Sequence, residues 1–336
     1  MACRKILTCK VKGMGMKALL VGINAKYIHT NLAIRNIAAY SADEPLVIYE
    51  ATINDNLDDI LEDILSYGTG LIGFSCYLWN IEDVLYTAEN IKKVRPEATI
   101  VLGGPEVSYE AADLLAANPC VDYIILGEGE ERFWQLYDAL SDQAPVEGID
   151  GLTYRINGQV AVNEPKGHLD LSTIPFSYGE ESLEHKLVYY ETSRGCPFRC
   201  AFCLSSLETG VRMADLKKVE QDLQRLAGLG VKVVKLVDRS FNCNLARAVD
   251  LFNLIRRLPG QTVFHCEINP ELVNEDFIKN LAGLKERLQF EVGIQSTNIK
   301  TLREISRTPD VNRSLEGIRM LKATGIMLHV DLIAGL

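Results

Sequence analysis

Three cysteines stand close together in the second half of the chain. Cys196, Cys200 and Cys203 are spaced C-x3-C-x2-C and follow Leu187–Thr192, a β-branched and aromatic run that predicts a buried strand. Thiolates are soft ligands that select zinc, copper(I) or iron–sulfur clusters. A zinc site would need a fourth ligand, and a cubane [4Fe–4S] cluster normally takes four cysteines. Three cysteines would therefore leave one iron open for a substrate or cofactor. A zinc knob and three unrelated buried thiols are the alternatives.

The cysteine loop resembles the cluster loop of the radical S-adenosylmethionine (radical SAM) enzymes. Their signature is C-x3-C-x-aromatic-C, and Phe202 supplies the aromatic here. The resemblance implies a [4Fe–4S] cluster ligated by the three cysteines, with Phe202 at the cofactor. It also implies that the open iron chelates S-adenosylmethionine (SAM) through its amino and carboxylate groups. One-electron reduction then cleaves SAM to a 5′-deoxyadenosyl radical.

Length and composition favour two globular domains without an export signal. The chain has 336 residues, of which 47% are hydrophobic and 24% charged, enough for two cores. No apolar run approaches the ~18 residues that span a bilayer, and the start lacks a signal-peptide pattern. We expect residues 1–15 to be an extension without structural role. Nine cysteines favour a reducing cytoplasm, and a net charge of −10 argues against a nucleic-acid partner.

The first half alternates between predicted strands and helices. Continuous apolar runs, such as 17–23 and 70–76, are typical of strands buried on both faces of a parallel sheet. Five strand–helix alternations predict a flavodoxin-like, doubly wound α/β domain over residues 16–140. Ligands of such sheets bind beyond the carboxyl ends of the strands. Ser75, Leu78, Gly103–Pro105 and Gly127–Glu128 lie there, although glycines in these loops alone could be tight turns.

The order of the two halves resembles the cobalamin-dependent (class B) radical SAM proteins. In that family a B12-binding domain precedes the radical SAM domain, and the loops after the third and fourth strands contact the corrin and its nucleotide tail. The resemblance implies cobalamin as a second cofactor. The residues that we expect to bind it are Ser75, Leu78, Gly103, Gly104, Pro105, Gly127 and Glu128.

The loop after the first predicted strand departs from one known cobalamin motif. Cobalamin mutases carry D-x-H-x-x-G there, and its histidine is the lower ligand of cobalt. Here Asn24–Asn31 has neither the aspartate nor the glycine. We therefore expect His29 to be an ordinary loop residue. The lower face of cobalt would be open, water-bound or capped by another side chain such as Tyr27.

A hairpin and a linker are predicted between the two domains. Residues 148–162 alternate around Asn157-Gly158, a strong hairpin signal. The segment 163–184 is rich in Pro, Gly, Ser and Glu, which is typical of a linker. We assign residues 141–186 to the hairpin and linker, and 187–336 to the radical SAM domain.

The βα alternation resumes after the cysteine loop and predicts part of a (β/α)6 barrel. Active residues of βα barrels lie at the carboxyl ends of strands, and about half of the polar residues there should be structural. The strand-end residues are Asp238, Arg239, Glu267, Asn269, Gln295, Ser296, His329 and Asp331. We expect Asp238, Glu267 and Gln295 to bind SAM, because the strings at 291–296 and 331–336 resemble the family's fourth and fifth strands.

The predicted barrel has five strands where the family has six, so we expect the sequence to be incomplete at its carboxyl end. The leading hypothesis is a radical SAM enzyme that uses cobalamin to methylate an unactivated centre. A cobalamin-assisted rearrangement or cyclisation and a non-catalytic corrinoid- or cluster-binding fragment are the alternatives. The implied partners are a small-molecule or peptide substrate and an electron donor such as flavodoxin or ferredoxin, with no membrane.

Overall fold

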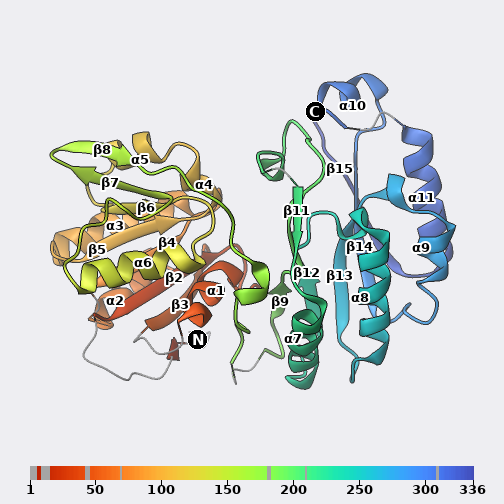
Figure 1. Ribbon diagram of the computed structural model, residues 1–336, viewed down its shortest axis with the longest axis horizontal. Helices are drawn as coiled ribbons and strands as arrows, with labels where there is room; N and C mark the ends of the chain where they lie inside the picture. Colours follow the sequence, from red (N-terminus) through yellow and green to blue (C-terminus); the bar gives the residue numbers. More distant parts are fainter. Residues whose placement is uncertain are drawn as a thin grey trace. The chain divides into compact units, whose positions relative to one another are not determined.

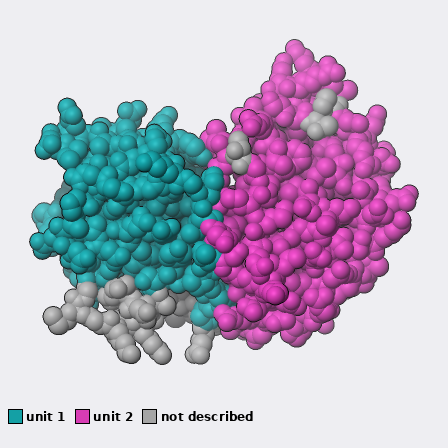
Figure 2. All heavy atoms as spheres, viewed as in Figure 1, with its two compact units in different colours: residues 1–169, 173–181 teal, residues 170–172, 182–336 magenta. Residues whose placement is uncertain are grey.

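The computed structural model describes residues 6–8, 16–41, 46–68, 70–179, 183–208, 210–307 and 310–336. The chain divides into two compact units, which Figure 2 shows in two colours. Unit 1 comprises residues 1–169 and 173–181, and unit 2 comprises residues 170–172 and 182–336. Each unit is built around its own sheet (Figure 1). Within the described ranges, no helix is long and apolar enough to cross a membrane.

Unit 1 contains a sheet whose strand order is β1-β3-β2-β4-β5-β6-β7-β8. The parallel strands are β2 (Ala18–Asn24), β3 (Leu46–Thr52), β4 (Leu71–Ser75), β5 (Thr99–Gly103) and β6 (Tyr123–Ile125). Their order, with the second strand of the series outside the first, is that of flavodoxin-like folds. The predicted fold is thus confirmed. The strand order reverses between β2 and β4, and this switch point is where such sheets bind ligands.

Helices cover both faces of this sheet. One face packs against α1 (Leu32–Tyr40) and α6 (Glu130–Ser141). The other packs against α2 (Leu57–Ser66), α3 (Ile81–Val94), α4 (Pro105–Ser108) and α5 (Ala111–Ala117). Alternate residues of β2 enter the two cores, and all of them are buried. Burial on both faces explains the continuous apolar runs of the sequence.

The amino-terminal extension differs from its prediction. Ile6–Thr8 forms β1 and pairs antiparallel with β3, with Thr8 opposite Val47. The expectation that residues 1–15 have no structural role is therefore wrong for this segment. Without β1, strand β3 would be an edge with unpaired backbone groups, which favours the addition of a strand. The other residues before Met16 lie outside the described ranges.

The predicted hairpin is present and extends the first sheet. β7 (Leu152–Ile156) and β8 (Gln159–Val162) pair antiparallel around Asn157 and Gly158. These two turn residues have φ of 51° and 78°, as a two-residue hairpin turn of this type requires. β7 also pairs antiparallel with β6. The hairpin is thus part of unit 1, and the linker character predicted for 141–186 is confined to the residues after it.

Unit 2 contains a parallel sheet with the order β15-β14-β13-β12-β9. Its strands are β9 (Leu187–Tyr190), β12 (Val233–Leu236), β13 (Val263–Ile268), β14 (Leu288–Gln295) and β15 (Met327–Leu332). Its helices are α7 (Leu216–Gly228), α8 (Leu245–Arg257), α9 (Glu275–Lys279), α10 (Ile299–Glu304) and α11 (Val311–Ala323). Short 3-10 helices are η1 (Leu171–Thr173), η2 (Leu204–Ser206), η3 (Phe241–Cys243) and η4 (Pro270–Leu272). The predicted βα alternation after the cysteine loop is confirmed.

Candidate cofactor sites

The cysteine loop of unit 2 begins in a two-stranded ribbon. β10 (Ser193–Cys196) pairs antiparallel with β11 (Gly210–Met213). Gly195 in this ribbon has φ of +95°, and a Cβ there would lie 2.3 Å from the carbonyl oxygen of Gly210. Only glycine tolerates both the backbone conformation and this close approach. Gly195 therefore allows the ribbon to close and places Cys196 at its end.

Asp238 holds the base of the cysteine loop. It follows β12 and is only 1% exposed. Its carboxylate accepts hydrogen bonds from the Thr192 backbone N (3.2 Å), from Thr192 Oγ1 (2.7 Å) and from Ser193 Oγ. Sequence analysis predicted contact with SAM, and that contact stays a prediction. The role in positioning the loop was not predicted, because it depends on a neighbouring strand far away in the sequence.

The buried carboxyl of Asp238 should make the stability of unit 2 depend on pH. Burial raises its pKa from 3.8 to about 6, although the hydrogen bonds from Ser193 and Thr192 lower it. The contribution of the buried Asp238 carboxyl to the unfolding free energy is therefore fully present below pH 4 and is lost as pH rises through 6. At ~1.4 kcal/mol per pKa unit it amounts to about 3 kcal/mol. Relative to Asp238→Asn, we expect the unfolding free energy of the unmodified protein to fall across this window in urea titrations. Parallel curves of unfolding free energy against pH for the two proteins would contradict this. The control is Asp276→Asn, which replaces an exposed carboxylate.

The three thiols of the cysteine loop differ in burial. Cys200 is buried, while Cys196 and Cys203 are half-buried. Burial raises the pKa of Cys196, and the nearby Cys203 and Cys200 thiols raise it further. Among the described residues no group of three ligating side chains converges on a single metal ion. A cubane cluster binds each cysteine through a different iron, so its ligands need not converge on one point. The donor set suits a cluster, and ligation by these cysteines stays a prediction, as does the role of Phe202, which is 44% exposed.

Arg307, which sequence analysis missed, ties the cysteine loop to the end of β14. Its Nη2 donates a 2.6 Å hydrogen bond to the Gly293 carbonyl, and its Nη1 lies 3.7 Å from Cys200 Sγ. The Ala201 backbone N also donates to the Ile305 carbonyl at 2.9 Å. A fixed guanidinium beside a cluster ligand suits an anionic ligand such as a carboxylate. Arg307 is too distant in sequence from the cysteines for local spacing to identify it.

Gln295 occupies a strained position where β14 ends. It has φ of +68° and lies at a shift in the pairing of β14 with β15. A Cβ on Gly293 would be 2.1 Å from Gln295 Nε2, so the glutamine side chain folds back over that glycine. Non-glycine residues with positive φ are uncommon and cluster at functional sites. This strain supports the predicted role of Gln295 without testing it. By contrast, Asn269 caps η4 by accepting from the Glu271 backbone N.

Asn31 joins the ends of β2 and β4 at the switch point of unit 1. It caps α1, and its Nδ2 donates to Asn24 Oδ1 (3.2 Å) and Ser75 Oγ (2.8 Å). A Cβ on Gly22 would lie 2.7 Å from this amide nitrogen, so glycine makes room for it. Ser75 is 5% exposed. Its hydroxyl is thus held by the protein, and its predicted contact with cobalamin stays a prediction.

The loop after β4 presents an exposed apolar surface. Asn80 fixes the loop by donating from Nδ2 to the carbonyls of Ile23 and Ser75, both at 2.9 Å. The Tyr77 and Trp79 rings stack with centroids 4.5 Å apart and an interplanar angle of 4°. Leu78 is 81% exposed. Leu78 was predicted as a cobalamin contact. The stacking of Tyr77 on Trp79 was not predicted, because ring stacking cannot be inferred from the spacing of residues alone.

The turn between β5 and α4 (Gly103–Pro105), which we call the shelf, packs against the start of the loop after β4. Gly104 has φ of +115°, and a Cβ there would lie 2.5 Å from the Cys76 carbonyl oxygen. Gly103 ends β5 and pairs with Ser75, while Pro105 begins α4. Glycine at 104 is therefore required by the close approach to the Cys76 backbone, and the expected contacts of Gly103, Gly104 and Pro105 with cobalamin stay predictions.

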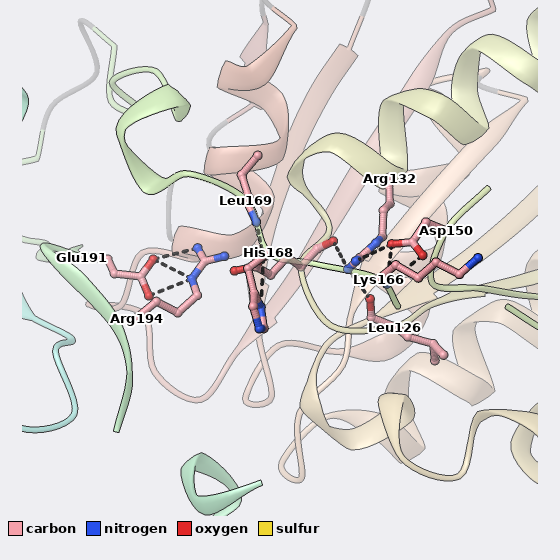
Figure 3. A network of polar contacts seen from close by, with 9 residues as sticks. Leu126, Arg132, Asp150, Lys166, His168, Leu169, Glu191 and Arg194 are labelled. Carbon is pink, nitrogen blue, oxygen red and sulfur yellow. Dashed lines mark hydrogen bonds and ion pairs between the residues drawn. The ribbon is translucent and has the colours of Figure 1, made fainter. Parts of the chain in front are cut away.

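Glu128 is engaged with the segment after the hairpin. Its Oε2 accepts a 2.7 Å hydrogen bond from the Leu169 backbone N. Nearby, Arg132 donates to Asp150 Oδ2 (2.8 Å) and to the Leu126 carbonyl (3.0 Å) (Figure 3). An open pocket of about 750 Å³ lies along these residues. Glu128 therefore has a structural role that was not predicted, and the expected contacts of Gly127 and Glu128 with cobalamin stay predictions.

Two family models match the chain, one in each unit. The B12-binding domain matches residues 18–136, and the radical SAM superfamily matches residues 190–336. The chain is a cobalamin-dependent radical SAM protein. Its two domains indicate cobalamin, a [4Fe–4S] cluster and SAM as cofactors, as the cysteine loop and the loops of unit 1 predicted.

Two relatives and a solved structure are similar to most of this chain. An uncharacterised methyltransferase of Pyrococcus horikoshii is 29% identical over 82% of this chain and 62% of its own length. The cobalamin-dependent radical SAM methyltransferase TokK of Streptomyces tokunonensis is 26% identical over 90% of this chain and 46% of its own. The radical SAM enzyme OxsB, solved with aqua-cobalamin and SAM, has a TM-score of 0.81 at 17% identity over 95% of this chain and 49% of its own. The chain thus spans about half to two-thirds of the length of these relatives.

His29 lies in a loop of unit 1 that lacks the D-x-H-x-x-G motif. Its backbone N donates to the Lys26 carbonyl (3.1 Å), and its carbonyl accepts from Asn24 Nδ2 (3.3 Å). We expect His29→Ala to leave the electron paramagnetic spectrum of bound cob(II)alamin unchanged, because the sequence predicts an ordinary loop residue here and no cobalt ligand. Loss of a nitrogen superhyperfine splitting in the variant would contradict this. Tyr27→Phe, in the same loop, tests the alternative that Tyr27 caps the lower face of cobalt.

Proposed function

We propose that this protein is an enzyme that cleaves SAM reductively and transfers a methyl group to an unactivated carbon or phosphorus centre. The observation that carries this proposal is the presence of a B12-binding domain and a radical SAM domain in one chain. Relatives named as methyltransferases support methyl transfer, and relatives named as anaerobic magnesium-protoporphyrin IX monomethyl ester cyclases keep cyclisation as the alternative. When bound, the cluster supplies an electron to SAM, and cobalamin supplies a methyl group.

Unit 1 would contribute the binding surface for cobalamin. Gly104, held against the Cys76 backbone, would let the ligand approach the main chain closely because it carries no side chain. Leu78 and the stacked Tyr77–Trp79 pair would cover an apolar macrocycle and exclude water from it. Asn31 and Asn80 keep the two loops in place through hydrogen bonds to the ends of β2 and β4.

Unit 2 would hold SAM at the cysteine loop. Asp238 and the Gly195 ribbon fix the start of this loop. Arg307, at 3.7 Å from Cys200 Sγ, would pair with the carboxylate of SAM by charge-assisted hydrogen bonds. Gln295 would present its amide to the same ligand. We further propose that flavodoxin or ferredoxin donates the electron and that the substrate is a small molecule or peptide.

Product analysis separates methyl transfer from the alternative reactions. The reconstituted protein is incubated without oxygen with a reductant and SAM, in parallel with and without cobalamin. Methyl transfer from SAM to cobalamin leaves S-adenosylhomocysteine, so we expect that product only in the sample with cobalamin. A rearrangement or cyclisation leaves 5′-deoxyadenosine alone or regenerates SAM. Absence of cobalamin-dependent S-adenosylhomocysteine would overturn the methyl-transfer proposal.

A further inference from the structure

Part of the predicted linker is fastened to unit 1. Residues 173–179, which we call the strap, belong to unit 1, although residues 170–172 directly before them belong to unit 2. Tyr178 in the strap is only 5% exposed, and Ser177 Oγ donates a hydrogen bond to Asn36 Oδ1 on α1. Connecting segments usually run over the surface of a protein. The burial of Tyr178 therefore needs a physical explanation.

The hydroxyl of Tyr178 contacts the loop that follows β2. It lies 3.2 Å from Thr30 Oγ1, and both residues are buried. Thr30 belongs to the Asn24–Asn31 loop, which stands where cobalamin mutases carry the lower ligand of cobalt. Burial of the ring alone would be enough to fasten the strap. The hydroxyl contact therefore adds a specific connection between the strap and this loop.

The ring of Tyr178 joins the strap to a buried ion pair. The Arg35 guanidinium lies 5.1 Å from the centroid of this ring, in the geometry of a cation–π contact. Arg35 Nη2 donates to Glu50 Oε2 on β3 at 2.8 Å, and the two side chains are 4% and 11% exposed. Glu50 Oε1 accepts from the backbone N of Asn31, whose side-chain amide donates to Ser75 Oγ. One series of contacts thus connects the strap with a residue at which we expect cobalamin.

We propose that the strap and cobalamin stabilise each other: Tyr178 positions the Asn24–Asn31 loop for the cofactor, and bound cobalamin holds the strap on unit 1. The strap then has a docked and a released state, and cobalamin binds the docked state more tightly. Such coupling is reciprocal, so docking raises cobalamin affinity by the same factor by which cobalamin favours docking. Tyr178 is thus a positioning residue. The inference rests on cobalamin binding by unit 1 and not on the proposed methyl transfer.

Hydrogen exchange of the full chain, measured by mass spectrometry with and without hydroxocobalamin, tests the coupling. In the unmodified protein we expect hydroxocobalamin to slow exchange of the strap amides about tenfold, within the range typical of coupled sites. Exchange in β8, at the edge of the same sheet, should not change. In Tyr178→Ala the strap should exchange at the same rate in both samples. The dissociation constant of hydroxocobalamin, measured by absorbance titration, should rise in this variant by about the same factor of ten.

A double-mutant cycle separates this coupling from a purely structural role of the tyrosine. Tyr178→Phe and Thr30→Val each remove the hydroxyl contact and leave the ring over Arg35. Each should raise the dissociation constant of hydroxocobalamin about fivefold, the ordinary worth of one hydrogen bond. The double variant should raise it no further, because both substitutions remove the same contact. Tyr86→Phe, which changes an exposed tyrosine of α3, is the control and should leave the affinity unchanged.

Four results would overturn the inference. Equal exchange of the strap with and without hydroxocobalamin would show that the two are not coupled. Unchanged cobalamin affinity in Tyr178→Phe and in Tyr178→Ala, with their folding checked by melting temperature, would make the strap a simple anchor. Additive effects in the double-mutant cycle would show that Tyr178 and Thr30 act separately. An unmodified protein that binds no hydroxocobalamin would remove the basis of the proposal. Absence of methyl transfer would overturn the proposed function and leave these measurements unaffected.

Discussion

We expect that replacement of Cys196, Cys200 and Cys203 together by alanine will abolish the iron–sulfur cluster and all reductive cleavage of SAM. This is the largest effect that we expect, because thiolates are the only soft ligands on the loop and no other residue type there binds cluster iron. The unmodified protein, reconstituted without oxygen, should hold about four irons per chain and show the broad visible absorption of a cubane. The triple variant should retain neither.

Cys120→Ala is the control for this experiment. Cys120 is a half-buried cysteine of unit 1, outside the radical SAM domain, and its replacement should leave the iron content unchanged. Retention of about four irons by the triple variant would contradict ligation by the cysteine loop. Loss of iron in Cys120→Ala as well would show that reconstitution depends on general thiol chemistry instead of this loop.

Gly104→Ala should weaken cobalamin binding strongly. The new Cβ would lie 2.5 Å from the Cys76 carbonyl oxygen, at φ of +115°. Positive φ alone costs roughly 1–3 kcal/mol in a residue with a side chain, and the clash forces the shelf to move. We expect the dissociation constant, measured by absorbance titration, to rise at least about tenfold, which corresponds to ~1.4 kcal/mol.

The adjacent glycine provides a matched control. A Cβ on Gly103 would have its nearest neighbour, the Ile125 carbonyl oxygen, at 3.7 Å, an ordinary contact, and Gly103 has no positive φ. Gly103→Ala should therefore leave unit 1 stable and reduce cobalamin affinity much less. Equal affinities for the two variants would show that the shelf at Gly104 does not contact the ligand.

The fold was predictable from sequence because local patterns and element order determine it. Continuous apolar runs alternating with amphipathic segments specify buried parallel strands with helices on both faces. Asn157-Gly158 specified the hairpin. By contrast, the pairing of Ile6–Thr8 with β3 was missed, since a three-residue strand is defined by its partner and has no periodicity of its own.

The candidate sites were predictable only in part. Spacing nominated the three cysteines as cluster ligands, and the loops at the ends of strands nominated Leu78 and Gly104 as cobalamin contacts; all of these stay predictions. Residues that act across long distances in sequence were missed. Arg307 contacts Cys200, which lies 107 residues away in the sequence, and Asn31 contacts Ser75, which lies 44 residues away. Asp238 was expected at a ligand, but its carboxylate faces Thr192 and Ser193, an orientation that only the packing of neighbouring strands determines.

The most direct test of the account is the product that the reconstituted protein makes from SAM. The full chain is loaded with iron, sulfide and cobalamin without oxygen, reduced, and given SAM, and the products are identified by mass spectrometry. We expect 5′-deoxyadenosine from the unmodified protein and none from the Cys196, Cys200 and Cys203 triple variant. Intact SAM in a sample that carries both cluster and cobalamin would contradict it.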